Sequence, residues 1–245
     1  MTPQLRIGIL GAARIAPAAL INPAKKNGEV VVAAVAARDA SRAQAFASRH
    51  GIPKVHAGYD DLVGDPDLDA IYNPLPKFSD IRYNYALAGG ATMDAGCYAV
   101  HMARTFGGEN PEVVSAQAKL RDPQVDRAMT AELRFPSGHT GRVHCSMWSS
   151  NLVRISARVI GSKGELRALN PVAPQVFHRL VVRSDGGRRV ERLPRRASYS
   201  YQLDAFAGAV LRGEPVKTTP EDAVANMTVI DAIYRAAGLP LREPA

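Results

Sequence analysis

The sequence predicts an α/β half built on a parallel sheet, followed by an α+β half with a mainly antiparallel open sheet. Three observations support this prediction. Strand and helix patterns alternate over the first part of the chain, a glycine-containing turn follows the first strand, and from about residue 112 the chain changes to stretches in which polar and apolar residues alternate. We expect a boundary between residues 1–76 and residues 77–245.

Two apolar strands open the chain. Residues 5–10 form a strand that is apolar apart from Arg6, and the run VVVAAVAA at 30–37 is typical of a strand buried on both faces. Between them we expect a helix from about Ile15, with Pro17 tolerated in the first turn because that turn has no internal N–H bond to lose. The pattern predicts a βαβ unit with parallel strands.

The first half continues with shorter elements. Asp39 or Ser41 is expected to cap a helix over RAQAFASRHG, which Gly51 ends. A short strand near Val55, a helical turn at YDDLV and a fourth strand at 69–73 complete the alternation.

The second half begins with a helix, GGATMDAGCYAVHMARTFGG, between two glycine pairs. A period of two then predicts antiparallel strands with one buried face at EVVSAQAKLR, DRAMTAELRFP, GRVHCSMWSS and VRISARVIGS. The last predicted elements are two helices, YSYQLDAFAGAVLRG and TPEDAVANMTVIDAIYRAAG, and Thr219 with Asp222 resembles a capping box in which Asp replaces Glu.

The composition is that of a globular protein, with 46% hydrophobic and 22% charged residues. The net charge of +8 favours anionic partners. We interpret the arginine-rich stretch at 183–196 as a solvated hairpin loop beside a strand rather than a nucleic-acid patch, because no aromatic residues lie between its arginines. We therefore expect no nucleic-acid partner.

The cysteines and the N-terminal region exclude further classes. Cys97 and Cys145 lie far apart, without the spacing of a zinc site or a disulfide framework, and Cys97 is expected to be a core residue. Arg14 interrupts the apolar stretch 7–21, and no basic region precedes it, so it predicts neither a signal peptide nor a membrane span. We expect a cytoplasmic protein with no metal and no membrane partner.

The turn after the first strand approximates the dinucleotide pattern G-x-G-x-x-G/A. Gly11 takes the first position, Ala13 the second and Ala16 the third. A methyl group at Ala13 still lets a pyrophosphate approach the following helix N-terminus, where free N–H groups favour anions. The pattern predicts a Rossmann-type sheet, with these candidate cofactor residues at the turn and after the fourth strand: Gly8, Gly11, Ala13, Arg14, Ile15, Ala16, Asn73 and Pro74.

The end of the second strand lies roughly 20 residues farther on, where the adenosine ribose is recognised. An acidic residue there would bind a 2′-hydroxyl, whereas Arg38, with Ser41 and Arg42 nearby, suits a 2′-phosphate. We predict NADP as the cofactor. NAD is the alternative, in which Asp39 binds the ribose and Arg38 is merely solvated.

Segments along almost the whole chain resemble the Gfo/Idh/MocA family, near its glucose-fructose oxidoreductase and dihydrodiol dehydrogenase branch. They are GILGAARIA at 8–16, AVAARDASRAQAFA at 34–47, DLDAIYNPLP at 67–76, AGGATMDAGCYAVHMAR at 88–104, and QLDAFAGAVLRGEP with DAVANMTVIDAIYRAAGLP. The resemblance implies an NAD(P)-dependent oxidoreductase that transfers hydride to or from a sugar, polyol or dihydrodiol. It also implies that residues 1–76 form a dinucleotide-binding domain, and that residues 77–245 form a domain for the substrate and for homo-oligomerisation through the C-terminal sheet.

The resemblance places Asp94 at the substrate-orienting carboxylate and Tyr98 at the proton-transferring position, with His101 as a secondary pocket residue. At a spacing of four, Asp94 and Tyr98 would share one face of an α-helix. A tyrosine can pass a proton to an alcohol if neighbouring positive charge lowers its pKa. Without the resemblance, the alternatives are a carboxylate favoured by the helix dipole and a half-buried aromatic residue.

The chain departs from the family at one point. The family has a Glu-Lys-Pro tripeptide whose lysine polarises the substrate oxygen, but no Glu-Lys pair occurs here, and IYNPLP runs directly into KFSDIRYNYALAGG. We infer that an intervening segment of the family is deleted, which would leave the Rossmann-type parallel sheet incomplete. We do not expect Lys77 to replace the lysine. The alternative function is therefore a non-catalytic remnant that at most binds nucleotide and self-associates.

Overall fold

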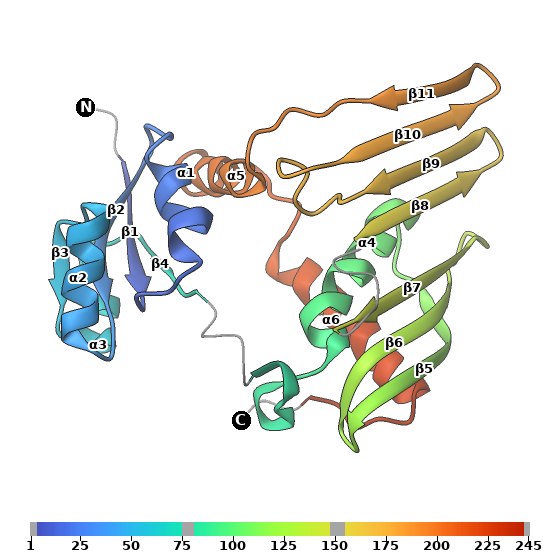
Figure 1. The fold of residues 1–245 in the computed structure, drawn as a ribbon, viewed down its shortest axis with the longest axis horizontal. Coiled ribbons are helices and arrows are strands. Elements are labelled where there is room, and N and C mark those ends of the chain that lie inside the picture. The colour runs from blue at the N-terminus through green and yellow to red at the C-terminus, as the bar shows by residue number, and fades with distance from the viewer. Residues whose placement is uncertain (1–3, 75–80, 148–154, 243–245) are drawn as a thin grey trace. The chain divides into compact units, whose positions relative to one another are not determined.

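The chain folds into two compact units. The computed structural model describes residues 4–74, 81–147 and 155–242. The first unit combines the N-terminal residues through β4 with residues 170–180 and 190–216, and the second unit contains the rest. Figure 1 shows a sheet with helices on both sides in the first unit, and helices with antiparallel strands in the second.

A four-stranded parallel sheet forms the centre of the first unit, in the order β3-β2-β1-β4. Every residue of β2 except Val31 is buried, because its Val and Ala side chains meet apolar neighbours on both faces. The predicted parallel sheet is confirmed. The strands are β1 (Leu5–Leu10), β2 (Val30–Ala36), β3 (Lys54–His56) and β4 (Ala70–Tyr72).

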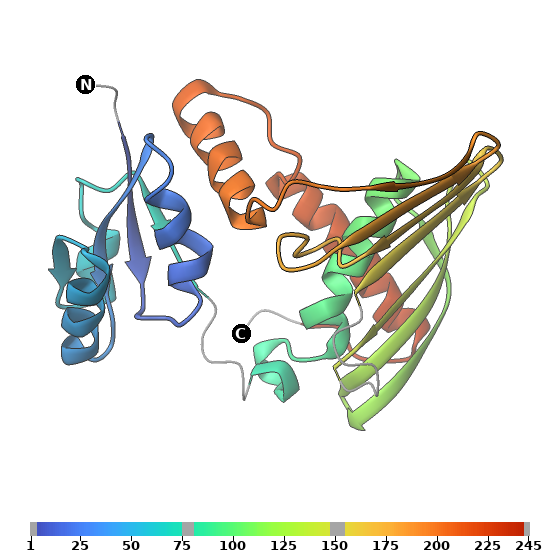
Figure 2. The ribbon, with the colours of Figure 1, turned by 45° about the horizontal axis from the view of Figure 1, so that its top comes forward.

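Helices cover both faces of this sheet, with α2 and α3 on one side and α1 and α5 on the other (Figures 1 and 2). The helix expected from about Ile15 begins at Pro17, as a π-helical turn that continues into α1. Gly51, with φ +72, ends α2 as predicted. The bounds are η1 (Pro17–Ile21), α1 (Asn22–Ala24), α2 (Ala40–His50), α3 (Tyr59–Val63) and α5 (Ser198–Arg212).

Helix α5 comes from the C-terminal half of the sequence but belongs to the first unit. Its buried residues Leu203 and Ala207 join Leu20 and Ile21 in the apolar core around β1. The first unit therefore extends beyond the sequence boundary expected after residue 76, because an apolar stripe from the distant helix is buried against it.

The second unit packs helices on a three-stranded antiparallel sheet, β5-β6-β7. Met129, Ala131 and Leu133 of β6 share one buried core with Ile230 and Ile233 of α6. The strands and helices predicted for this unit are present, and two short 3-10 turns precede them. The bounds are η2 (Ile81–Tyr83), η3 (Tyr85–Leu87), η4 (Thr92–Gly96), α4 (Cys97–Gly107), β5 (Glu112–Asp122), β6 (Val125–Arg134), β7 (Thr140–Ser146) and α6 (Pro220–Ala236).

A second sheet, of four strands in the order β11-β10-β9-β8, completes the predicted antiparallel region (Figure 1). The arginine-rich stretch lies on an exposed hairpin of β10 and β11 and on the segment after it, as predicted. The bounds are β8 (Ser156–Gly161), β9 (Gly164–Leu169), β10 (Arg179–Ser184) and β11 (Gly187–Glu191). Within the described parts of the chain, no helix has the length and apolarity needed to cross a membrane.

Candidate functional site

The glycine-containing turn follows β1 directly. Gly11 has φ +98, a left-handed conformation that glycine adopts at little cost. Its N–H donates to Ala36 O at 2.6 Å, and Ala13 N donates to Gly11 O at 2.9 Å. Among the described residues other than its chain neighbours, the only atom within 4 Å of a methyl group built on Gly11 would be the Tyr59 hydroxyl oxygen, at 3.6 Å. The space beside Gly11 is therefore largely open.

Two small residues pack the elements around this turn. Ala16 is fully buried, as the third position of the pattern requires. Gly8 lies inside β1, where an added methyl group would come within 2.7 Å of Leu68 Cδ1, so glycine has a packing reason there. Arg14 is exposed and Ile15 is half-buried.

At the end of β2, the two residues considered for ribose recognition have different surroundings. Asp39 is the N-cap of α2, and its carboxylate accepts hydrogen bonds from Ser41 Oγ at 2.6 Å and Arg42 N at 3.1 Å. The bond from the Ser41 hydroxyl, followed by that from Arg42 N, lowers the pKa of Asp39. Arg38 is exposed. Arg42 Nη2 also donates to Ala12 O at 3.4 Å, which connects α2 with the glycine turn.

The remaining predicted cofactor residues follow β4, where Asn73 is exposed and Pro74 is buried. Because β1, β2 and β4 are parallel neighbours, the turns after them lie at one edge of the sheet. Dinucleotides bind outside the carboxyl ends of the strands in open α/β sheets. The structure thus brings Gly11, Arg38 and Asn73 to the edge where such a cofactor binds.

The segment predicted to carry catalysis lies in the second unit. Its first turn, η4, is π-helical, a feature frequent at functional sites. Asp94 lies in this turn, and its Oδ1 accepts a hydrogen bond from Arg82 Nε at 3.1 Å. The Arg82 and Asp94 side chains are 37% and 27% exposed, so a small molecule can reach the pair.

Tyr98 lies in the first turn of α4 and is 57% exposed. The expectation that it shares a face with Asp94 assumed α-helical spacing throughout. The π-helical turn alters that register, because its hydrogen bonds span five residues instead of four. Both side chains nevertheless lie on one short helical segment.

His101 contacts α6. Its Nδ1 lies 3.4 Å from Asp222 Oδ2, and Arg104 Nη1 lies 2.9 Å from the other oxygen of the same carboxylate. Thr219 Oγ1 accepts a bond from Asp222 N at 3.2 Å, so the N-cap half of the predicted capping box is present. His101 thus has a structural partner, and its role toward a substrate stays a prediction.

Other candidate groups have little reactive character. Burial raises the pKa of the Cys97 thiol, in keeping with a core residue. In the part of the chain that the structure describes, no three His, Cys, Asp or Glu side chains gather as a metal site would require.

Sequence reasoning missed Arg82 and Asp126. Arg82 meets Asp94 only because the chain reverses through η2 and η3, which no local pattern announces. Asp126 is fully buried on β6 and accepts hydrogen bonds from Thr92. The β5–β6 pairing shifts register near Leu120. The alternation of buried and exposed residues along these strands therefore does not predict that Asp126 is buried.

Two family profiles match this chain. Residues 5–93 match the GFO_IDH_MocA oxidoreductase family, described as an NAD-binding Rossmann fold, and residues 68–167 match the GFO/IDH/MocA C-terminal domain. The predicted nicotinamide dinucleotide cofactor is therefore confirmed at the level of the family.

Characterised relatives share the sequence at modest identity. D-xylose 1-dehydrogenase (NADP(+)) 2 of Haloferax volcanii is 28% identical, with 95% of this chain and 97% of the relative covered. Trans-1,2-dihydrobenzene-1,2-diol dehydrogenase of Bos taurus is 26% identical, with 59% of this chain and 68% of the relative covered. The first alignment runs over 317 positions, more than the 245 residues of this chain, so the relative has residues without a counterpart here. This agrees with the inferred deletion.

Solved structures share the fold. KijD10, a 3-ketoreductase from Actinomadura kijaniata in complex with NADP and TDP-benzene, matches with a TM-score of 0.82 at 21% identity, over 95% of this chain and 98% of that one. The aldose-aldose oxidoreductase from Caulobacter crescentus matches with a TM-score of 0.83 at 20% identity, over 96% and 98%. The alternative of a non-catalytic remnant gains no support from these relatives. This chain belongs to the Gfo/Idh/MocA family of oxidoreductases, with an NAD(P)-binding Rossmann unit and an α+β C-terminal unit.

Proposed function

We propose that this protein is an NADP-dependent oxidoreductase that transfers hydride to or from a sugar, polyol or dihydrodiol. The observation that carries the choice of NADP is the engagement of Asp39 in capping α2. Both capping bonds go to Oδ1 of Asp39, which fixes this carboxylate against α2, and the exposed Arg38 beside it suits a 2′-phosphate. The name of the Haloferax volcanii relative includes NADP(+).

The turn at Gly11 suits a dinucleotide on geometric grounds. Its positive φ and the open space beside Gly11 let a pyrophosphate approach the backbone closely. Arg42 reaches this turn from α2 and adds positive charge near the phosphates. When bound, the nicotinamide supplies the hydride chemistry, and the protein supplies binding and orientation.

Asp94 and Tyr98 are the proposed substrate residues. An ionised carboxylate only accepts hydrogen bonds, so Asp94 orients a substrate hydroxyl, and the bond from Arg82 fixes the direction of the carboxylate. Tyr98 exchanges a proton between its hydroxyl and the substrate oxygen. The names of the relatives, a xylose dehydrogenase and a dihydrodiol dehydrogenase, support the substrate class.

Thermal unfolding with NADP, with NAD and without ligand tests the cofactor. A ligand at a hundred times its dissociation constant adds about 2.7 kcal/mol to the folded state, so we expect a clear rise in the midpoint with NADP. Arg38→Ala should reduce the rise for NADP but not for NAD. Arg49→Ala, on the exposed far end of α2, is the matched control. An equal response of Arg38→Ala and Arg49→Ala to NADP would contradict the assignment.

Turnover of NADP with D-xylose, and with a dihydrodiol, tests the chemistry. Tyr98→Phe should lower kcat by roughly 10²–10⁴-fold, the usual contribution of general acid–base catalysis. Tyr201→Phe, an exposed tyrosine on α5, should turn over like the wild type. Unchanged turnover in Tyr98→Phe would remove this residue from the mechanism.

We also propose self-association through the C-terminal sheets. Large apolar side chains are exposed on their strands, among them Val114 and Leu120 on β5 and Ile160 on β8. Sedimentation of the wild type and of Ile160→Lys should show a shift toward monomer in the variant.

A further inference from the structure

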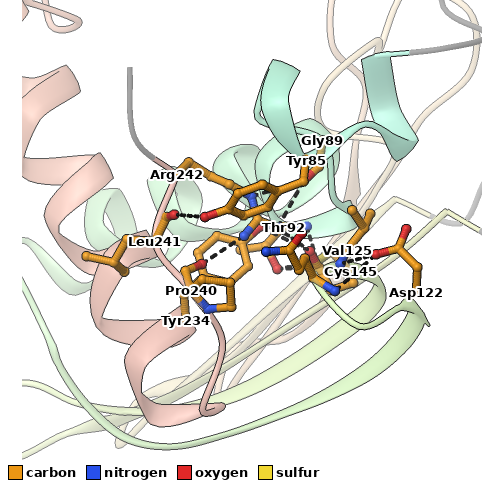
Figure 3. Close-up of polar contacts among 12 residues, drawn as sticks. Tyr85, Gly89, Thr92, Asp122, Val125, Cys145, Tyr234, Pro240, Leu241 and Arg242 are labelled. Atoms are coloured by element: carbon orange, nitrogen blue, oxygen red, sulfur yellow. Dashed lines mark hydrogen bonds and ion pairs between the residues drawn. The ribbon is translucent and has the colours of Figure 1, made fainter. Parts of the chain in front are cut away.

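A buried polar cluster lies at the start of the segment that carries Asp94 and Tyr98 (Figure 3). The Asp126 side chain is 0% exposed, and the Arg242 side chain is 3% exposed. The cluster joins residues 85–92, strand β6 and residues 234–242, which are far apart in the sequence. The chemistry proposed above does not use these side chains.

The Asp126 carboxylate has partners at both oxygens. Oδ2 accepts hydrogen bonds from Thr92 N at 2.8 Å and Thr92 Oγ1 at 2.7 Å. Oδ1 accepts one from the Tyr234 hydroxyl at 3.0 Å and lies 3.6 Å from Arg242 Nη2. Burial, followed by the Asp126 charge, raises the pKa of Tyr234, so this hydroxyl stays a donor. The first residue of η4 is therefore held at both its backbone and its side chain.

Arg242 holds Gly89, three residues before Thr92. Its Nε and Nη2 donate to Gly89 O at 3.1 and 3.0 Å. Its guanidinium lies over the rings of Tyr234 and Tyr85, at 4.2 and 4.9 Å from their centroids. Tyr85 in turn donates its hydroxyl hydrogen to Leu241 O at 2.6 Å, a bond visible in Figure 3.

Gly90 lies between the two held residues. It has φ +141, and an added methyl group would overlap Asp126 Oδ1 and lie 2.9 Å from the Tyr234 hydroxyl oxygen. Gly90 N donates to Arg82 O at 2.9 Å, and Asp94 N donates to Gly90 O at 3.0 Å. The backbone groups of both Arg82 and Asp94 are thus bound to the residue that the cluster encloses.

We propose that Asp126 and Arg242 are positioning residues for the reaction proposed above, on which this inference rests. They hold the backbone from Gly89 to Thr92 and, through Gly90, the pair of Arg82 and Asp94 in one geometry. A misplacement of about 1 Å at a catalytic group lowers turnover by roughly 10²-fold. The dinucleotide turn lies in the other unit and is not held by the cluster.

Two variants test the proposal by turnover. Asp126→Asn removes the charge, and the milder Thr92→Val removes one hydrogen bond. Thr105→Val is the matched control, because the hydrogen bond that Thr105 Oγ1 makes within the described residues goes to His101 O of the same helix, α4. We expect kcat with NADP and D-xylose to fall at least about 10-fold in Asp126→Asn and less in Thr92→Val, with the NADP dissociation constant unchanged. The proposal would be overturned if Asp126→Asn and Thr92→Val, after correction for the fraction of folded protein, had the same kcat as Thr105→Val.

Hydrogen exchange of the amides in residues 89–98 provides a readout that needs no turnover. A wild type without turnover on any sugar or diol would count against the proposed function, and the exchange rates would still test the positioning. We expect faster exchange in Asp126→Asn and Thr92→Val than in Thr105→Val. Unchanged exchange in both would overturn the inference. Arg242→Lys, which keeps the charge, should be less affected than Arg242→Met.

Discussion

Both candidate functional segments contain a glycine with positive φ, and the surroundings of the two glycines are opposite. Gly11, at φ +98, has open space beside it, with the Tyr59 hydroxyl oxygen 3.6 Å from where a methyl group would lie. Gly90, at φ +141, is enclosed by Asp126, Tyr234 and Arg242. The first turn leaves its backbone accessible to a ligand, whereas side chains of the protein occupy the corresponding space at the second. The same residue type is therefore accessible at one turn and enclosed at the other.

Gly90→Ala is expected to lower the free energy of unfolding more than the other substitutions compared below. The methyl group overlaps Asp126 Oδ1 and separates this buried carboxylate from its partners. Breaking a buried ion pair costs about 3–5 kcal/mol, and we expect a loss of that order in the free energy of unfolding, measured with urea. A loss below about 1 kcal/mol would contradict the enclosed surroundings described for Gly90.

Gly11→Ala should lower the free energy of unfolding less than Gly90→Ala does, but it should weaken NADP binding. An alanine in a left-handed conformation costs about 1–2 kcal/mol, and no close overlap adds to this cost. The methyl group would nevertheless stand where the pyrophosphate approaches, so the rise in midpoint with NADP should disappear. An unaltered NADP response would mean that the open turn is not the cofactor site.

A pH series tests the contribution of a buried carboxylate in the first unit, Asp65. Asp65 Oδ2 lies 2.8 Å from both Lys54 Nζ and His56 Nε2. The hydrogen bond from Lys54 is the main reason that its pKa falls from 3.8 to about 2. A lowered folded pKa stabilises the protein above the unfolded value, and this contribution is lost as pH falls from about 4 to 2. Between pH 5 and 2, the unfolding midpoint of the wild type should therefore fall more steeply than that of Asp65→Asn, and equal slopes would contradict this assignment.

The smallest expected effect on stability is that of Arg42→Ala. Its exposed side chain contacts the glycine turn through one long hydrogen bond, of 3.4 Å to Ala12 O. Exposed substitutions of this kind change stability by less than about 0.5 kcal/mol. We expect weaker NADP binding with the unfolding midpoint of the free protein unchanged, measured in one ligand titration. A large loss of stability would show that the turn depends on α2.

Several predictions from the residues alone are confirmed where local patterns carry the information. The apolar run of β2 and the glycine after β1 located the parallel sheet and its turn, because a strand buried on both faces and a left-handed turn each leave a composition signal. The choice between Asp39 and Ser41 as the cap of α2 could not be made this way. Both are good caps, and only the geometry shows Ser41 donating to Asp39.

The residues alone predicted the family, the alternation of strands and helices in the first half, and the nicotinamide cofactor, because these depend on short segments whose residues are contiguous. Only the tertiary structure decided that α5 belongs to the first unit and that Asp126 and Arg242 enclose Gly90. These arrangements join residues far apart in the chain, such as Tyr85 and Leu241, 156 positions apart. No local pattern encodes such pairings, because they result from the burial of apolar faces and from the need of buried charges for partners.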